Sequence, residues 1–294
     1  MIAHQFLGLA ALTALASACA PELLKRDGWR GAHIAKRAEP GARAWSFELA
    51  EAWNQLNPEW STCYSGRRQS PINLRSKWGY YTQEPPTFHY PENLTGKIDN
   101  WDFGPQFSIE VDDDNKTAAY IEFDHDGDPE IAYFRQWHVH TAAEHTIDGY
   151  RPKGEIHFVH YDDAGVPRSV IGFFFDRKSK YDDYNFNFTG PAIDATGSAF
   201  YGQLDRLELP DIFSNNTLEA VELDLNLLVK EAKGYKKFWT YKGSLTTPPC
   251  SEGIRWFISP EIIWLSDNQT ESLLRASTFG DRPVNSVWDH DINV

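Results

Sequence analysis

The segment Gln136-Trp137-His138-Val139-His140 places two histidines one residue apart in a stretch typical of a β-strand. Side chains at positions i and i+2 of a strand point to the same face, so His138 and His140 project together and Val139 points away. A third histidine follows in the strand-like run Glu155-Ile156-His157. Three imidazoles around an open fourth position are the ligand set of a catalytic zinc rather than a structural one. The sequence therefore predicts a metal centre built on neighbouring strands.

Two of these histidines have a polar residue two positions earlier, on the same strand face. Gln136 precedes His138, and Glu155 precedes His157. A zinc-bound imidazole needs an acceptor for its other ring N–H, which fixes its tautomer and orientation. We therefore expect Gln136 and Glu155 to brace the ligands.

Two further histidines are expected to be structural. His160 lies three residues after His157 and so on the opposite face of the strand. His145 directly follows Glu144, and we interpret it in the same way as His160. Both are predicted to be buried and hydrogen-bonded rather than to bind the metal.

The rest of the chain is typical of a mainly β protein with peripheral helices. Runs of β-branched and aromatic residues, separated by Asp, Asn, Gly and Pro, predict strands. These runs are 107–111, 119–123, 133–140, 155–161, 169–175, 238–241 and 254–258. Helices are predicted over 47–55, 218–228 and 267–276, the last with Ser266 or Asp267 as N-cap. No internal repeat or linker divides the chain after about residue 45, so we expect a single domain.

The N-terminus reads as a secretory signal followed by a propeptide. Residues 1–20 contain an apolar run and end in the small-x-small site Ala18-Cys19-Ala20. A membrane anchor is the alternative, although the run is short for a span. Dibasic pairs at 25–26 and 36–37 predict a propeptide over 21–37, with an ordinary basic linker as the alternative. The catalytic domain would then be 38–294, secreted and extracellular.

Charge and cysteine content agree with an extracellular protein. The formal net charge of −14 argues against nucleic acid or an anionic membrane as a partner. Because Cys19 leaves with the signal, Cys63 and Cys250 are the only possible intramolecular pair. An oxidising compartment favours a disulfide between them, with two unpaired buried thiols as the alternative.

Five Asn-x-Ser/Thr sequons are candidates for glycosylation and predict surface positions. Their asparagines are Asn93, Asn115, Asn187, Asn215 and Asn268. In a secreted chain, five such sites make a glycoprotein the natural expectation.

A loop rich in hydroxyl groups and proline lies downstream, in the segment 243–250. Pro248-Pro249 excludes both helix and ladder pairing, so the loop is rigid. The hydroxyl of Thr246 can both donate and accept a hydrogen bond, which would be useful beside a metal-bound hydroxide. On spacing alone, a simple turn explains this segment equally well.

Taken together, these segments resemble the alpha-class carbonic anhydrases of the secreted type. The matching segments follow the family order over roughly residues 45 to 285: 68–73, 136–140, 144–149, 155–160, 244–250 and 282–283. The resemblance implies a large central twisted sheet, mostly antiparallel, that holds zinc (Zn²⁺). It also implies reversible hydration of carbon dioxide to bicarbonate and a proton by attack of zinc hydroxide.

The resemblance assigns a role to each matching residue. His138, His140 and His157 become the zinc ligands, with Gln136, Glu155 and the backbone carbonyl of Gly280 as their hydrogen-bond partners. The Thr246 hydroxyl would donate to Glu144 and accept from the zinc-bound hydroxide. The substrate pocket would comprise Val159, Val170, Leu245, Thr247 and Trp256. Cys63 and Cys250 match the disulfide of secreted members.

The chain departs from the family pattern on the proton route. Fast members carry a shuttle histidine in the segment that corresponds to 99–107, and here this segment contains no histidine. No shuttle is therefore identified, and His290 is only a remote candidate. Phe47 stands where a tyrosine hydroxyl is common. We expect proton transfer to depend on buffer.

Two other functions fit parts of the pattern. A non-enzymatic relative kept for binding or storage would share the fold, although such relatives usually lose a zinc histidine. A cupin-like barrel would use Glu144 as a metal ligand, but it predicts Asn where Tyr161 stands and does not explain the 244–250 loop. The sequence makes no prediction of oligomeric state.

Overall fold

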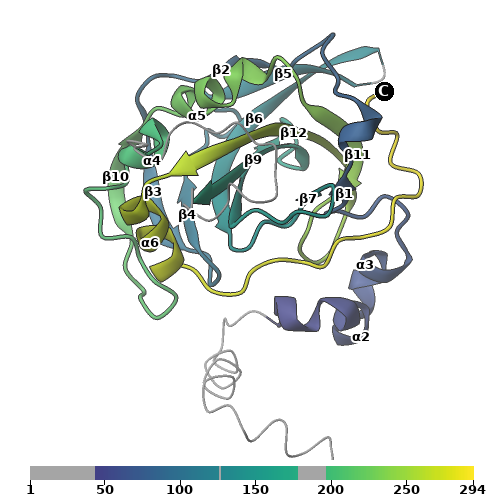
Figure 1. Cartoon of the computed structure of the whole chain (residues 1–294), viewed down its shortest axis with the longest axis horizontal. Helices are drawn as coiled ribbons and strands as arrows, with labels where there is room; N and C mark the ends of the chain where they lie inside the picture. Colours follow the sequence, from purple (N-terminus) through teal and green to yellow (C-terminus); the bar gives the residue numbers. More distant parts are fainter. Residues whose placement is uncertain (1–43, 126, 178–196) are drawn as a thin grey trace, which may run out of the picture. The chain divides into compact units, whose positions relative to one another are not determined.

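A ten-stranded sheet dominates the computed structural model, which describes residues 44–125, 127–177 and 197–294. Contacts divide the chain into 1–46 and 47–294, and the sheet lies entirely in the larger unit. The strand order is β10-β3-β4-β6-β8-β9-β12-β11, with β5 also paired to β6 and β2 to β5 (Figure 1). The strands are β2 (Thr87–His89), β3 (Leu94–Asn100), β4 (Pro105–Ser108), β5 (Tyr120–His125), β6 (Asp128–His140), β8 (Gly154–Tyr161), β9 (Pro167–Arg177), β10 (Leu218–Leu223), β11 (Trp239–Ser244) and β12 (Glu252–Leu265).

Pairing within this sheet is antiparallel except between β9 and β12, which run parallel. Strands β1 (Asn73–Leu74) and β7 (Thr146–Ile147) form a separate parallel pair. The predicted mainly β fold with a large, mostly antiparallel sheet is therefore confirmed. The sheet is open rather than closed, so it is not the barrel that the cupin alternative requires.

Strand β6 is long enough to pair with two successive neighbours along one side. Its first half pairs with β5 and its second half with β4, while β8 runs along its other side. The register places His138 directly opposite His157 and His140 opposite Glu155. Two predicted ligands on one strand and a third on the next are thereby brought to one place.

The sheet separates two apolar clusters. Alternation along β6 sends Trp137 and Val139 into the larger cluster, with Phe107, Phe158 and other aromatic side chains. The opposite face carries the histidines and a smaller cluster that includes Trp256. Burial of each such aromatic side chain stabilises the fold by about 1.5–3 kcal/mol. The central strands β8 and β9 are buried along nearly their whole length, which fixes the position of β8 and its His157.

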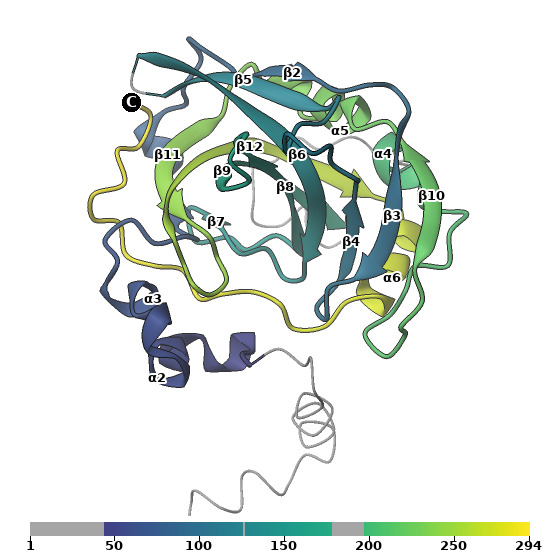
Figure 2. The same ribbon diagram turned by 180° about the vertical axis from the view of Figure 1, so that it is seen from behind.

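Helices are short and surround the sheet (Figures 1 and 2). The α-helices are α2 (Trp53–Leu56), α3 (Thr62–Ser65), α4 (Ala199–Gly202), α5 (Asn226–Glu231) and α6 (Asp267–Arg275), and the 3-10 turns are Phe47–Ala52, Pro58–Trp60, Ser76–Trp78 and Lys233–Tyr235. Helix α6 has the predicted N-cap at Ser266, which forms a reciprocal capping box with Gln269. Across the described ranges, no helix is long and apolar enough to span a membrane.

One predicted helix is partly wrong. Residues Leu218–Leu223 form the edge strand β10, and the helix α5 begins only at Asn226. Apolar residues at 218, 221, 225 and 228 fit a helical spacing, but β10 pairs with β3 and tertiary pairing overrides that local preference. Strand β3 was not predicted, because Thr95, Gly96 and Lys97 give little strand signal. The run predicted over 107–111 corresponds to β4, which ends earlier, at Ser108.

The sequons and the N-terminal segments are covered only in part. Asn93, Asn215 and Asn268 are exposed, whereas Asn115 is partly exposed and its amide donates to the Asp163 carbonyl at 3.3 Å. Asn187, the predicted signal 1–20 and the propeptide 21–37 lie outside the described residues.

Candidate metal centre

Three histidines from two adjacent strands meet on one face of the sheet. One ring nitrogen from each of His138, His140 and His157 lies within 4.8 Å of the others. His140 and His157 are buried, and His138 is partly buried. The structure thus brings together the three residues that the sequence predicts as ligands, in a group able to hold a metal ion.

The second ring nitrogen of each histidine faces an oxygen that can only accept. His138 Nδ1 lies 2.9 Å from Gln136 Oε1, and His140 Nδ1 donates to the Gly280 carbonyl. His157 Nε2 lies 2.9 Å from Glu155 Oε1. The Nδ1 atoms of His138 and His140 therefore carry the ring hydrogens, which turns the Nε2 atoms of these two residues toward a shared ion. His157 Nε2 is close to Glu155 Oε1 but does not have the geometry of a hydrogen bond, and its Nδ1 lies 3.9 Å from Glu144 Oε2.

Burial favours the neutral imidazole of His140 and of His157, the form that binds metals. Burial lowers the pKa of His140 well below its usual value, and the neighbouring His157 lowers it further. Burial also lowers the pKa of His157, against an opposing effect of Glu155. His140 Nε2 is buried and has no hydrogen-bond partner among the described residues. A buried polar atom of this kind is costly unless something binds it, which fits a metal at this point.

Glu155 organises a second group that shares His157. Its Oε2 accepts from the backbone nitrogens of Glu144 and His145, at 3.0 and 2.9 Å. Its Oε1 lies 2.8 Å from His145 Nδ1. His145 continues through Nε2 to the Tyr241 hydroxyl at 2.7 Å. Although His145, Glu155 and His157 are close enough to hold a metal, both ring nitrogens of His145 and both oxygens of Glu155 already take part in hydrogen bonds. The three-histidine group therefore fits a metal better.

Glu144 lies beside two of the histidines, and Thr246 interacts with Glu144. Glu144 is buried; its Oε1 accepts from the Arg282 backbone nitrogen at 2.9 Å, and its Oε2 lies 3.4 Å from His140 Nε2. Burial raises the pKa of Glu144 well above its usual value, while hydrogen bonds from the Thr246 hydroxyl and the Arg282 N–H oppose that rise. Of the two predicted catalytic residues, Glu144 thus lies next to His140, and Thr246 is linked to this group through Glu144.

The loop that carries Thr246 is tied down by a disulfide. Cys63 and Cys250 are bonded across a separation of 187 residues, so the alternative of two free thiols is wrong. Arg282 binds the same region, with Nη2 donating to the Cys63 carbonyl at 2.9 Å and Nη1 to the Ser70 carbonyl at 2.7 Å. The loop is therefore joined covalently to Cys63, and Arg282 binds the carbonyl of that same cysteine.

The predicted substrate-pocket residues lie partly together. Val159, Val170 and Trp256 are buried in one apolar cluster, and Leu245 packs against it. The Trp256 ring lies 4.9 Å from the His157 ring, centroid to centroid. Thr247 follows Thr246 on the loop, where its carbonyl accepts from the Cys250 nitrogen at 2.9 Å.

The remaining histidines have other partners. His160 is buried against the Tyr90 hydroxyl at 2.8 Å, and burial lowers its pKa to about 3. His145 is also buried and hydrogen-bonded, as predicted. His290 is buried, with Nε2 2.9 Å from the Gln69 carbonyl and Nδ1 accepting from the Trp288 nitrogen. Both His290 ring nitrogens are therefore occupied by backbone, which removes it as a shuttle candidate.

Sequence reasoning missed one residue of the centre, Trp101. Its ring lies 4.9 Å from that of His138 and 5.2 Å from that of His140, and the residue is 6% exposed. Trp101 lies in the turn between β3 and β4, and β3 was itself not predicted. No spacing in the sequence links it to the histidines.

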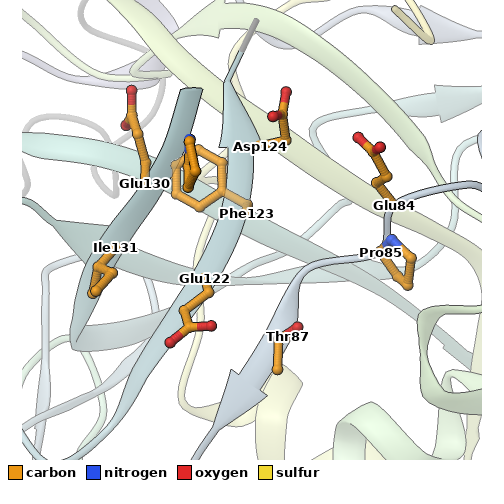
Figure 3. A pocket seen from close by; sticks show the side chains of 9 residues that line it. Glu84, Pro85, Thr87, Glu122, Phe123, Asp124, Glu130 and Ile131 are labelled. Atoms are coloured by element: carbon orange, nitrogen blue, oxygen red, sulfur yellow. The ribbon is translucent and has the colours of Figure 1, made fainter. Parts of the chain in front are cut away.

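A separate pocket of about 480 Å³ lies near the other end of β6 (Figure 3). Carboxylates of Glu84, Glu122, Asp124 and Glu130 line it together with Phe123. None of the predicted site residues contributes to it.

Comparison with known proteins points to a single family. The model of the eukaryotic-type carbonic anhydrases matches residues 49–286. A carbonic anhydrase of Klebsiella pneumoniae is 29% identical over 247 residues, which cover 83% of this chain and 87% of that protein. The structure of the alpha-carbonic anhydrase of Thermovibrio ammonificans with the inhibitor sulfanilamide aligns with a TM-score of 0.64 and 26% identity, covering 83% of this chain and 94% of that one. Dioscorin complexed with ascorbate aligns with a TM-score of 0.61 at 20% identity over 83% and 92% of the two chains, a likeness of fold alone.

Proposed function

Because the chain belongs to the eukaryotic-type carbonic anhydrase family, we propose that it is an enzyme that reversibly hydrates carbon dioxide to bicarbonate and a proton. In this proposal His138, His140 and His157 hold a zinc ion. The observation that carries it is the convergence of three ring nitrogens within 4.8 Å, with each opposite ring nitrogen facing a fixed oxygen.

The donor set suits zinc in a catalytic role. Three neutral imidazoles leave the ion its full charge, whereas thiolates would offset it. When bound, zinc supplies a hydroxide nucleophile at neutral pH by lowering the pKa of its water to about 7, for which carbonic anhydrase is the standard example.

Glu144 and Thr246 would orient the nucleophile. The positive charge of a bound metal ion would oppose the rise in the pKa of Glu144 that burial causes. An ionised Glu144 only accepts hydrogen bonds, so it would direct the Thr246 hydroxyl hydrogen toward itself. The Thr246 oxygen then presents lone pairs to a neighbour that donates. A nucleophile that donates a hydrogen bond to Thr246 would have its own lone pair aimed at the substrate, which is a positioning effect.

The apolar cluster beside His157 suits an uncharged substrate. Val159, Val170 and Trp256 offer no hydrogen-bonding side-chain group toward a small molecule except the Trp256 Nε1, which already donates to the Ser244 carbonyl at 3.0 Å. Carbon dioxide loses little hydration on entering such surroundings, whereas bicarbonate loses much. This difference favours release of the product.

We also propose that the protein acts outside the cell. The disulfide supports this, since such bonds persist in oxidising compartments. Mass spectrometry of secreted protein would show whether the chain begins after residue 20 or after residue 37, and whether the exposed Asn93, Asn215 and Asn268 carry glycans.

Stopped-flow measurement of carbon dioxide hydration tests the main proposal. The protein loaded with zinc should accelerate hydration, and a chelator should abolish the acceleration. His140→Ala should abolish it as well, whereas His89→Ala, on β2, should leave it unchanged. A protein shown to contain one zinc per chain but with no rate above background would overturn the proposal in favour of a binding or storage role.

A further inference from the structure

Trp101 contacts two of the three candidate ligands at once. Its ring approaches His138 at an interplanar angle of 65° and His140 at 69°. Both are edge-to-face contacts, the arrangement that aromatic pairs prefer over a face-to-face sandwich. A single side chain from outside β6 and β8 therefore bears on both imidazoles of the His-x-His motif.

Trp101 is itself fixed to the strand that carries these histidines. Val139 is the residue between the two candidate ligands, and its carbonyl accepts a hydrogen bond from the Trp101 indole Nε1 at 3.3 Å. The Trp101 backbone nitrogen donates to the Gly104 carbonyl at 3.1 Å, which closes the turn between β3 and β4. These two hydrogen bonds fix the position of the Trp101 ring relative to β6.

Two buried aromatic residues support Trp101. The Phe103 ring lies 4.9 Å from the Trp101 ring, and the Phe47 ring lies 6.1 Å from it. Phe47 also lies 6.0 Å from the His140 ring. Any tilt of the tryptophan would have to displace these rings, which are 1% and 2% exposed.

A hydrogen bond at Nδ1 does not by itself fix an imidazole. It sets the direction of one nitrogen, but the ring can still tilt about that bond. A rigid ring edge packed against the imidazole limits this motion. Trp256 has the same relation to His157, with a ring distance of 4.9 Å and its Nε1 bound to the Ser244 carbonyl.

We propose that Trp101 is a positioning residue for metal binding. It holds His138 and His140 in the orientation in which their Nε2 atoms can share one ion. The inference rests on the proposed zinc centre, but it concerns metal affinity and not turnover.

The test compares zinc affinity in the full-length Trp101→Ala, Trp101→Phe and Trp239→Phe variants by competition with a chelator. Trp239 is a matched control, because it is fully buried in the same sheet and its ring packs on Tyr80. The zinc dissociation constant should rise about 10-fold in Trp101→Ala, the lower end of what loss of a ligand-orienting contact costs. Trp101→Phe keeps an aromatic edge and should recover most of the affinity. Trp239→Phe should leave it unchanged.

A spectroscopic measurement separates positioning from general loss of stability. The visible spectrum of the cobalt-substituted protein reports ligand geometry, and it should change in Trp101→Ala but not in Trp239→Phe. If Trp101→Ala does not fold, Trp101→Leu replaces it, since leucine keeps volume without an aromatic edge. Wild-type affinity and spectrum in the Ala or Leu variant would overturn the inference. Tight zinc binding that depends on Trp101, without carbon dioxide hydration, would instead overturn the proposed function alone.

Discussion

Arg282 binds the carbonyl of Cys63 through Nη2 at 2.9 Å, while its backbone nitrogen binds Glu144 Oε1 at the same distance. One residue thus connects the disulfide to the carboxylate beside the metal centre. Burial lowers the pKa of Arg282 to about 10, so it remains charged at neutral pH.

The first prediction concerns this connection. Replacing both cysteines, in Cys63→Ser/Cys250→Ser, should lower the free energy of unfolding by roughly 3–5 kcal/mol, because the bond closes a long loop. Hydration activity should fall even where the protein remains folded, since the Thr246 loop loses its anchor. Urea denaturation and stopped-flow assays would measure the two effects. The wild type in reductant serves as the control without the disulfide. The prediction would be contradicted if the variant and the reduced wild type both unfolded at the same urea concentration as the oxidised wild type.

The second prediction concerns Gln136. Removing the acceptor for His138 Nδ1 in Gln136→Ala should weaken zinc binding about 10- to 100-fold. Gln106→Ala is the matched control, because Gln106 pairs with His138 across β4 and β6 but its side chain donates to Asp99 at 3.4 Å. Chelator competition measures both, and equal affinities in the two variants would refute the role of Gln136.

The third prediction concerns Thr246. Thr246→Val keeps the shape but removes the hydroxyl, so kcat/KM for hydration should fall on the order of 100-fold, the usual cost of losing one oriented hydrogen-bonding group. Zinc content should stay at one per chain. Thr240→Val, at an equally buried position on β11, should keep full activity. A Thr246→Val enzyme of wild-type rate would exclude the orienting role.

The fourth prediction concerns acid stability. Burial lowers the pKa of His160 from 6.5 to about 3. Between these two pH values, His160 is therefore protonated in the unfolded chain but neutral in the folded chain. His160 should therefore reduce stability by ~1.4 kcal/mol per pH unit as the pH falls from 6.5 toward 3, and have no such effect above 6.5. Unfolding curves should show a shallower pH dependence for His160→Gln. Tyr90→Phe, which keeps the histidine, should retain the wild-type dependence, and parallel curves for wild type and His160→Gln would disprove the assignment.

The fifth prediction concerns the proton route. The segment 99–107 would carry a shuttle histidine. Its two buried aromatic side chains are Trp101 and Phe103, and neither can relay a proton at neutral pH. Turnover should therefore rise with imidazole concentration at constant pH and ionic strength. A buffer-independent turnover would show that another group carries the proton.

The grouping of the three candidate metal ligands could be predicted because it depends on local periodicity. Residues 138 and 140 share a face in any strand, and His157 needed only an adjacent antiparallel strand in register. Trp101 could not be predicted in this way. Its contact with His138 depends on a turn that precedes His138 by 37 residues. The strand β10 was missed for a similar reason, since its pairing with β3 outweighs a helical spacing of apolar residues.

Whether a single histidine is buried could be predicted at one position but not at another. His160 was predicted to be buried from strand alternation alone. The position of His290 depends on the C-terminal segment reaching Gln69, 221 residues away in the sequence. No local pattern encodes a contact of that kind, so its removal as a shuttle candidate required the structure.

The carbonyl that binds His140 belongs to Gly280, 140 residues further along a chain of 294. During synthesis, that carbonyl is added only after 140 further residues have followed His140. A growing chain therefore has its three histidines well before it has the acceptor for His140 Nδ1, so an ion would meet the complete group only after Gly280 has been made.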